Sequence, residues 1–170
     1  MDLIDALSIR AATPDDLAEV DALFQRSYPR LLRGDYPPSV LVTSIPIISR
    51  AQPALLASGT FYLAERNGEV VGAGGWSEAG PGGGRQGRRG VAHVRHVVTD
   101  HRLTRQGIGR TLLGHVMMAA AGAGMAEMRC QSTLTAVPFY RALGFSEVGP
   151  ITVELPRGIG FPAMLMRRIL

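Results

Sequence analysis

The sequence predicts one α/β (α+β) domain in which about four helices flank a mixed sheet of about seven strands. Three observations carry this prediction. Runs with strand-like alternation are interleaved with runs of helical period, two strand-like runs are joined by Asn67-Gly68, and no repeat or linker divides the chain. The 170 residues, 46% of them hydrophobic, are enough for one buried core, so we expect a single domain over residues 1–170.

The first strand is expected at residues 7–11, where apolar and polar residues alternate. A helix then begins at Thr13, which can cap it, with Pro14 suited to its first position. Apolar residues at helical spacing give this helix one buried face: Leu17, Val20, Leu23 and Phe24. A second, less regular helix is expected within residues 38–49.

A hairpin follows, with strands at 60–66 and 69–76 around Asn67-Gly68, the strongest short signal for a two-residue turn. The next strand is expected at 91–99. Between them lies a Gly/Arg-rich loop, residues 79–90, which we interpret as a solvated connection. The alternative is a lid over an anionic substrate, using Arg85, Arg88 and Arg89.

The C-terminal half is expected to hold two helices and three strands. Gly107-Ile108-Gly109 opens a helix whose apolar stripe comprises Ile108, Leu112, Val116 and Ala120. A strand follows at 125–132, and Thr135 can cap a short helix that ends before Gly144. The last strands are expected at 145–155 and 163–169.

Composition removes several classes of function. All 18 basic residues are arginines, so the chain has no lysine for a P-loop or a Schiff base. Its one cysteine, Cys130, cannot form an internal disulfide or a CxxC pair, and we read it as a small buried residue. The four histidines lack HxH or HExxH spacing, so we expect no metal.

The charge balance and the apolar segments indicate where the protein acts. A net charge of +4 is a modest excess; it is the only feature that suggests nucleic-acid binding, and we expect no nucleic-acid partner. The longest apolar stretch, residues 116–126, is too short to span a membrane, and residues 1–5 lack the basic start of a signal peptide. We therefore expect a cytoplasmic protein without a membrane partner.

Two segments carry the chemistry. In the first, Arg105 to Arg110, two glycines open a helix, and exposed amides at a helix start bind anions such as a diphosphate. A dinucleotide fingerprint would need a third glycine at Leu112, so the alternative is a helix start without a ligand. In the second, Ser132 to Phe145, Tyr140 stands apart from core residues, and the alternative is a tyrosine at the edge of the core.

Together, these segments resemble the Gcn5-related N-acetyltransferase (GNAT) superfamily, bacterial members of unassigned substrate included. The first is similar to its acetyl-CoA motif Q/R-x-x-G-x-G/A, with Thr104 in place of the usual Gln or Arg. The second is similar to A-x-x-F-Y-x-x-x-G-F, matched by Ala136, Phe139, Tyr140, Gly144 and Phe145. Trp76 with Gly72, Gly74 and Gly75 resembles the third strand of a bacterial subgroup, so the likeness covers nearly the whole chain.

The resemblance implies a twisted, mostly antiparallel sheet whose fourth strand splays from the fifth. It implies that pantetheine pairs with the fourth strand like an added strand, at Val97, Val98 and Thr99. A backbone amide of that strand would polarise the thioester carbonyl. The diphosphate would lie on the turn formed by Arg105, Gln106, Gly107, Ile108, Gly109 and Arg110.

Acetyl transfer to an amine needs a proton donor and a proton acceptor. Tyr140 matches the general acid of the superfamily, because a phenol stays protonated at neutral pH. For the base we favour His93, at a position where some members carry a glutamate or a histidine. The alternatives are ordered water and His96, which strand alternation places on the opposite face from His93, Arg95, Val97 and Thr99.

The resemblance therefore implies an acyl-CoA-dependent N-acyltransferase. It would move an acetyl group from acetyl-CoA, its co-substrate, to a primary amine by direct attack through a tetrahedral intermediate. The acceptor would be a small-molecule or peptide amine, and dimers are common among similar proteins, which makes a homodimer an expectation. The alternative function is a catalytically silent acyl-CoA-binding sensor or partner protein of the same fold.

Overall fold

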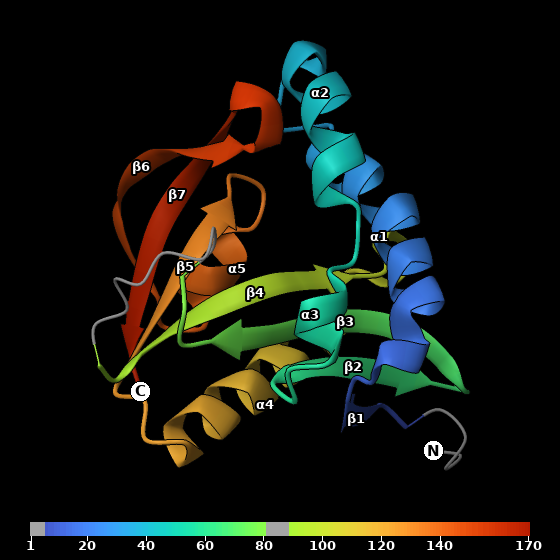
Figure 1. The fold of residues 1–170 in the computed structure, drawn as a ribbon, viewed down its shortest axis with the longest axis vertical. Helices are drawn as coiled ribbons and strands as arrows, with labels where there is room; N and C mark the ends of the chain where they lie inside the picture. Colours follow the sequence, from blue (N-terminus) through green and yellow to red (C-terminus); the bar gives the residue numbers. More distant parts are fainter. Residues whose placement is uncertain (1–5, 81–88) are drawn as a thin grey trace.

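A computed structural model describes residues 6–80 and 89–170 and shows a seven-stranded mixed sheet (Figure 1). The strand order is β1-β2-β3-β4-β5-β7-β6, and every neighbouring pair is antiparallel except β4–β5. The predicted mixed, mostly antiparallel sheet is therefore confirmed. Its strands are β1 Ser8–Ala11, β2 Phe61–Arg66, β3 Glu69–Ser77, β4 Val91–Thr99, β5 Glu127–Thr133, β6 Ser146–Leu155 and β7 Ile159–Ile169.

Five α-helices accompany the sheet: α1 Leu17–Leu32, α2 Pro38–Ile48, α3 Pro53–Leu56, α4 Ile108–Gly122 and α5 Val137–Ala142. Short 3₁₀ turns lie at Pro14–Asp16, His101–Leu103 and Pro156–Gly158. The prediction of about four helices missed α3, whose four residues are too few to show a helical period. Helix α1 also continues through Pro29, beyond the apolar pattern that predicted its start.

Helices cover both faces of the strands β2 to β4. Helix α1 packs on one face of β3 and β4, and α4 packs on the other, so the protein has two buried clusters (Figure 1). The first centres on α1 and reaches β7 through Phe161. The second is built on the predicted stripe of α4, whose four residues are all buried: Ile108, Leu112, Val116 and Ala120.

Turn and cap residues set the element boundaries. Asn67 (φ 53°) and Gly68 (φ 75°) both adopt the left-handed conformation that a type I′ turn requires, which confirms the predicted hairpin. Gly144, at φ 88°, ends α5 as expected. The predicted cap of α5 is wrong: Thr133 Oγ1, not Thr135, accepts a hydrogen bond from the Ala136 amide, at 3.2 Å.

Part of the sequence prediction falls outside the described residues. Residues 1–5 and most of the Gly/Arg-rich loop, including Arg85 and Arg88, belong to this part. Arg89 lies in the turn that precedes β4. Within residues 6–80 and 89–170, no helix is long and apolar enough to cross a membrane.

Candidate active site

The two central strands separate and open a cavity. Strands β4 and β5 are paired at three positions only, Val91–Glu127, Ala92–Met128 and His93–Arg129. Beyond these, β5 pairs with β7 on its other side, and the facing edges of β4 and β5 border a cavity of about 1810 Å³. The splay that the resemblance implied is therefore present, and it leaves β4 backbone without a neighbouring strand on that side.

A β-bulge interrupts β4 inside this cavity. Opposite β3, Val98 pairs with Ala73 and Arg95 with Gly75, so Gly74 faces two residues, His96 and Val97. His96 adopts a left-handed backbone conformation, φ 45°. The expectation that strand alternation separates His96 from Arg95 is therefore wrong, because both contact the α1 side of the sheet, through Phe24 and Gln52. Val97 does lie on the opposite face from His96, packed against the cluster of α4.

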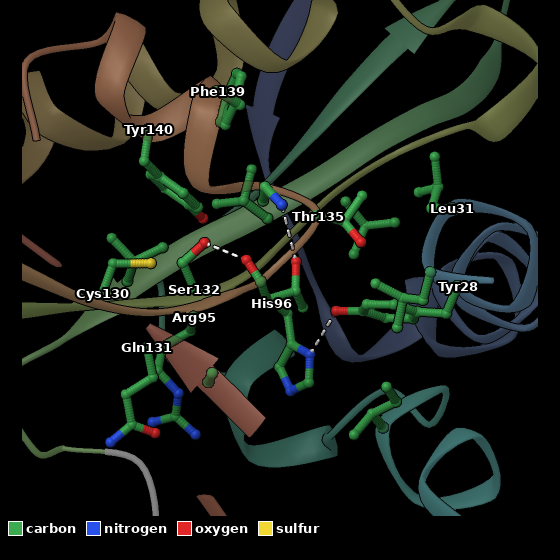
Figure 2. A pocket seen from close by; sticks show the side chains of 18 of the residues that line it. Tyr28, Leu31, Arg95, His96, Cys130, Gln131, Ser132, Thr135, Phe139 and Tyr140 are labelled. Carbon is green, nitrogen blue, oxygen red and sulfur yellow. Dashed lines mark hydrogen bonds between the residues drawn. The ribbon is translucent and has the colours of Figure 1, made fainter. Parts of the chain in front are cut away.

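His96 is held by aromatic neighbours from α1. Its ring stacks on Phe24 with centroids 5.3 Å apart, and Nδ1 lies 3.2 Å from the Tyr28 hydroxyl (Figure 2). Burial, and in smaller part the charge of Arg95, lower the pKa of His96 from 6.5 to about 4. The imidazole is therefore neutral at physiological pH.

His93, the residue we predicted as the base, borders a smaller cavity of about 240 Å³ instead. The two cavities share four bordering residues, namely Gly80, Val94, Cys130 and Gln131. Burial, followed by the charges of Arg129 and Arg95, lowers the pKa of His93 below its usual value. His93 is thus neutral at pH 7 and is separated from the main cavity by the residues that border both cavities. Its role as a base stays a prediction.

The glycine turn after β4 forms one end of the main cavity. Gly107 has φ 80°, and the first hydrogen bond of α4 runs from the Thr111 amide to the Gly107 carbonyl, at 3.0 Å. The amides of residues 108–110 precede this bond and are free to bind an anion. A Cβ on Gly109 would lie 3.1 Å from both Phe139 and Thr99 Oγ1, so the glycine lets these two side chains pack closely against the start of α4.

Of the residues predicted to bind acetyl-CoA, all but one border the main cavity: Val97, Val98, Thr99, Arg105, Gly107, Ile108, Gly109 and Arg110. The exception is Gln106, whose Oε1 instead accepts a hydrogen bond from Arg66 at 2.8 Å. Just before this turn, the buried carboxylate of Asp100 accepts from the Arg102 amide at 3.0 Å and pairs with Arg26 at 3.0 Å. These contacts join the turn to β4 and α1.

Tyr140 borders the same cavity from α5. Its side chain is buried, with Phe139 and Phe145 edge-on at 5.2 and 5.3 Å. Burial and interaction with the Cys130 thiol raise the pKa of Tyr140 well above 10, so its hydroxyl is protonated at physiological pH (Figure 2). Cys130 is buried as predicted, and burial raises the pKa of its thiol to about 12.

The far end of the cavity contains residues that the sequence analysis did not select. Arg95 borders it from β4, Gln52 from the segment between α2 and α3, and Gln131 from β5. The apolar walls come from α1, α2, β6 and β7. No local motif marks these residues; only the bulge and the splay bring them together. Among the described residues, no three His, Cys, Asp or Glu side chains are grouped as metal ligands.

Several solved structures have a similar fold. A GCN5-related N-acetyltransferase from Rhodopseudomonas palustris superposes with a TM-score of 0.76 at 17% identity, over 100% of this chain and 99% of that one. PaiA N-acetyltransferase from Thermoplasma acidophilum, solved in complex with coenzyme A, gives 0.70 at 15% identity, over 97% and 99%. Ribosomal-protein-alanine N-acetyltransferase from Brucella melitensis gives 0.65 at 21%, over 96% and 99%. At these identities the likeness establishes the fold.

Sequence comparison identifies the family. A search of curated proteins gives no significant match. The family model "Acetyltransferase (GNAT) domain" matches residues 47–168, which run from the end of α2 to the last residues of β7 and make up well over half of the chain. This protein therefore belongs to the GNAT acetyltransferase family.

Proposed function

We propose that this protein transfers an acetyl group from acetyl-CoA to a primary amine by direct attack. The observation that carries the proposal is the main cavity between β4 and β5, with the anion-binding turn at one end and a protonated phenol, Tyr140, in its wall. The chain's membership of the GNAT family supports acetyl-CoA as the donor.

The residues at the turn fit a CoA molecule. Left-handed Gly107, with nothing within 4 Å of its Cβ position, lets a diphosphate reach the helix amides, and Arg105 and Arg110 add positive charge beside them. The backbone of Val97 to Thr99 lacks a β5 neighbour, so an extended pantetheine arm can pair with it as an added strand. The proposed diphosphate and pantetheine hydrogen bonds use backbone groups, so Thr104 in place of Gln or Arg removes none of them.

Three proton transfers accompany the reaction. The amine nitrogen bonds to the thioester carbon, giving a tetrahedral intermediate, and collapse breaks the carbon–sulfur bond. In this proposal Tyr140 gives its proton to the departing sulfur, and the nitrogen loses its extra proton as the carbonyl reforms, which returns Tyr140 to the protonated phenol. The ammonium form of the acceptor must first lose a proton, and we assign that proton to His93 through water at the wall that both cavities share.

A second function has one observation in its favour. Burial raises the pKa of Tyr140 well above 10, which makes the phenol a weaker acid than an exposed tyrosine. A protein that only binds acyl-CoA, as a sensor or partner protein, would not need a better proton donor. The two functions share the CoA end of the cavity and differ in turnover.

Ligand-induced stabilisation tests the donor site. We expect acetyl-CoA and CoA to raise the melting temperature and NADH to leave it unchanged, because a ligand at 100 times its Kd adds about 2.7 kcal/mol. The absence of any shift with either CoA species would contradict both functions.

Tyr140→Phe separates the two functions. For an acetyltransferase we expect at least a hundredfold loss of amine-dependent thiol release, the usual contribution of a general acid, with CoA stabilisation retained. The matched control is Tyr62→Phe, a buried tyrosine that packs on His115 and does not border the cavity. A wild-type protein that binds CoA but releases none with any amine is the sensor.

The proposal includes the setting expected from the sequence. We propose a cytoplasmic enzyme that acts on a small-molecule or peptide amine and has no nucleic-acid or membrane partner. We also propose that it forms a homodimer, which sedimentation of the purified protein tests directly.

A further inference from the structure

Arg95, at the far end of the cavity, has no anionic partner within residues 6–80 and 89–170. The Arg95 side chain is half-buried on β4, donating to Ser77 Oγ at 3.1 Å and to Gln52 Oε1 at 3.4 Å. Both acceptors are neutral. These two contacts leave most of the five N–H donors of the guanidinium available.

Of the other part-buried arginines of the described chain, Arg26 and Arg129 have a carboxylate close by, whereas Arg66 and Arg168 form no ion pair but do not border the cavity. Arg26 pairs with Asp100 at 3.0 Å, and Arg129 lies 3.6 Å from Glu127. None of the ion pairs among residues 6–80 and 89–170 includes Arg95. A guanidinium removed from water without a counter-charge is costly, and burial lowers its pKa accordingly. A bound anion would remove that cost.

The position of Arg95 indicates whether acetyl-CoA or the acceptor would supply the anion. The anion-binding turn follows the end of β4, and Thr99, the last residue of the strand, lies about 10 Å from Arg95, because the bulge leaves only three residues of β3 opposite this segment. In the proposed function the pantetheine arm runs along Val97 to Thr99 toward the bulge. Arg95 therefore lies beyond the acetyl end of the donor, where the acceptor must enter.

The neighbours of Arg95 fit the same substrate. The register of the paired positions, extended by two residues, places Gln131 of β5 beside Arg95 across the splay. Figure 2 shows both side chains directed to the same side, away from Tyr140. Apolar residues complete the walls: Leu31, Ile48, Ile151 and Val153. Among the described residues, the one carboxylate bordering the cavity is Glu154, which is exposed on the edge strand β6.

We propose that the acceptor is a primary amine that also bears a carboxylate, as a free amino acid does, and that Arg95 binds this carboxylate. This inference rests on the proposed function and names its substrate class. A planar guanidinium matches a carboxylate with two parallel hydrogen bonds, and the Gln52 and Gln131 amides can add donors. The same charge repels polyamines, so cationic acceptors are disfavoured.

The test compares free amino acids with their C-terminal amides as acceptors, measured by acetyl-CoA-dependent thiol release. The amides keep the amine and lose the carboxylate. We expect kcat/KM for the best amino acid to exceed that for its amide at least tenfold, and Arg95→Gln to abolish this preference. Arg95→Lys keeps the positive charge but loses the two parallel N–H donors of the guanidinium, so this variant should retain part of the preference for the free amino acid. The matched control is Arg33→Gln, an exposed arginine at the end of α1 that does not border the cavity.

A binding measurement distinguishes failure of the inference about the acceptor from failure of the proposed acetyltransferase function. With CoA bound, N-acetylated amino acids should raise the melting temperature of the wild type but not of Arg95→Gln, and stabilisation by CoA alone shows that the variant is folded. Equal turnover with amides, or a preference for polyamines, would overturn the inference and leave the acetyltransferase function standing. Failure of CoA to stabilise the wild type would overturn both.

Discussion

Acidification should destabilise this protein through His96. The ring lies at the β4 bulge, stacked on Phe24 and 3.2 Å from the Tyr28 hydroxyl. The charged group nearest in the chain is Arg95, which opposes a second positive charge. Tyr28 is itself neutral, because burial raises the pKa of its phenol. Nothing among these neighbours compensates an imidazolium.

The sign and the size follow from the two pKa values. In the unfolded chain the imidazole takes up a proton below its ordinary pKa of 6.5, whereas in the folded protein it does so only near 4. Between these values the unfolded state binds more protons, so the free energy of unfolding decreases as the pH falls. The full stability is present above pH 6.5, and about 3 kcal/mol is lost by pH 4. Because the ring also borders the cavity, this figure is an upper limit.

Urea unfolding of the wild type and of His96→Asn measures this loss, followed by the fluorescence of Trp76, the one tryptophan. Asparagine tolerates the left-handed conformation at this position and does not titrate. We expect the wild type to lose up to about 3 kcal/mol relative to the variant between pH 7 and pH 4. The control is His115→Asn on the exposed face of α4. A wild-type-to-variant difference that does not change with pH would refute the reasoning.

Three further predictions concern close packing. Gly109→Ala places a methyl group 3.1 Å from Phe139, and we expect calorimetry to show at least tenfold weaker acetyl-CoA binding. The control is Gly114→Ala, in open space within α4. This variant should bind acetyl-CoA like the wild type and gain about 0.5–1 kcal/mol of stability. Gly75→Ala would put a Cβ 2.7 Å from the Phe61 Cα and should cost more than about 2 kcal/mol in urea unfolding; wild-type stability would contradict the β2–β3 register. Cys130, whose pKa burial raises to about 12, should resist an aromatic disulfide reagent at pH 8 in the native protein and react fully in urea; a fast native reaction would mean that the cavity exposes the thiol.

The elements that the sequence predicted have signals of short range. Asn67-Gly68 determines the hairpin because both residues accept positive φ, and the stripe on α4 repeats at helical spacing over 13 residues, from Ile108 to Ala120. The glycine turn was predicted for the same reason, since its function depends on a few consecutive backbone amides. In these cases the residues that decide the structure are neighbours in the chain.

The features that the sequence did not predict depend on distant partners. Helix α3 is four residues long, too short for a periodic pattern, and forms where Leu55 and Leu56 enter the core beside α1. Position in the sequence favours Thr135 as the cap of α5, but it is Thr133, at the end of β5, that reaches the Ala136 amide. Arg95 belongs to no local motif, because the role that we propose for it depends on the splay of β4 from β5.

The β4 bulge shows how such a feature is nonetheless encoded. Gly74 of β3 faces two residues of β4, and a Cβ on it would lie 2.9 Å from Val97 Cγ2 and 3.2 Å from Val97 Cα, so only a glycine leaves room for the extra residue. Two positions earlier, a Cβ on Gly72 would lie 3.1 Å from Ile108, the first residue of α4. The glycines of β3 thus make room both for the bulge and for the start of α4. The bulge and the start of α4 lie at the two ends of the cavity, so the glycines of β3 contribute to both ends. Neither the sequence of β3 nor that of β4 predicts this arrangement by itself.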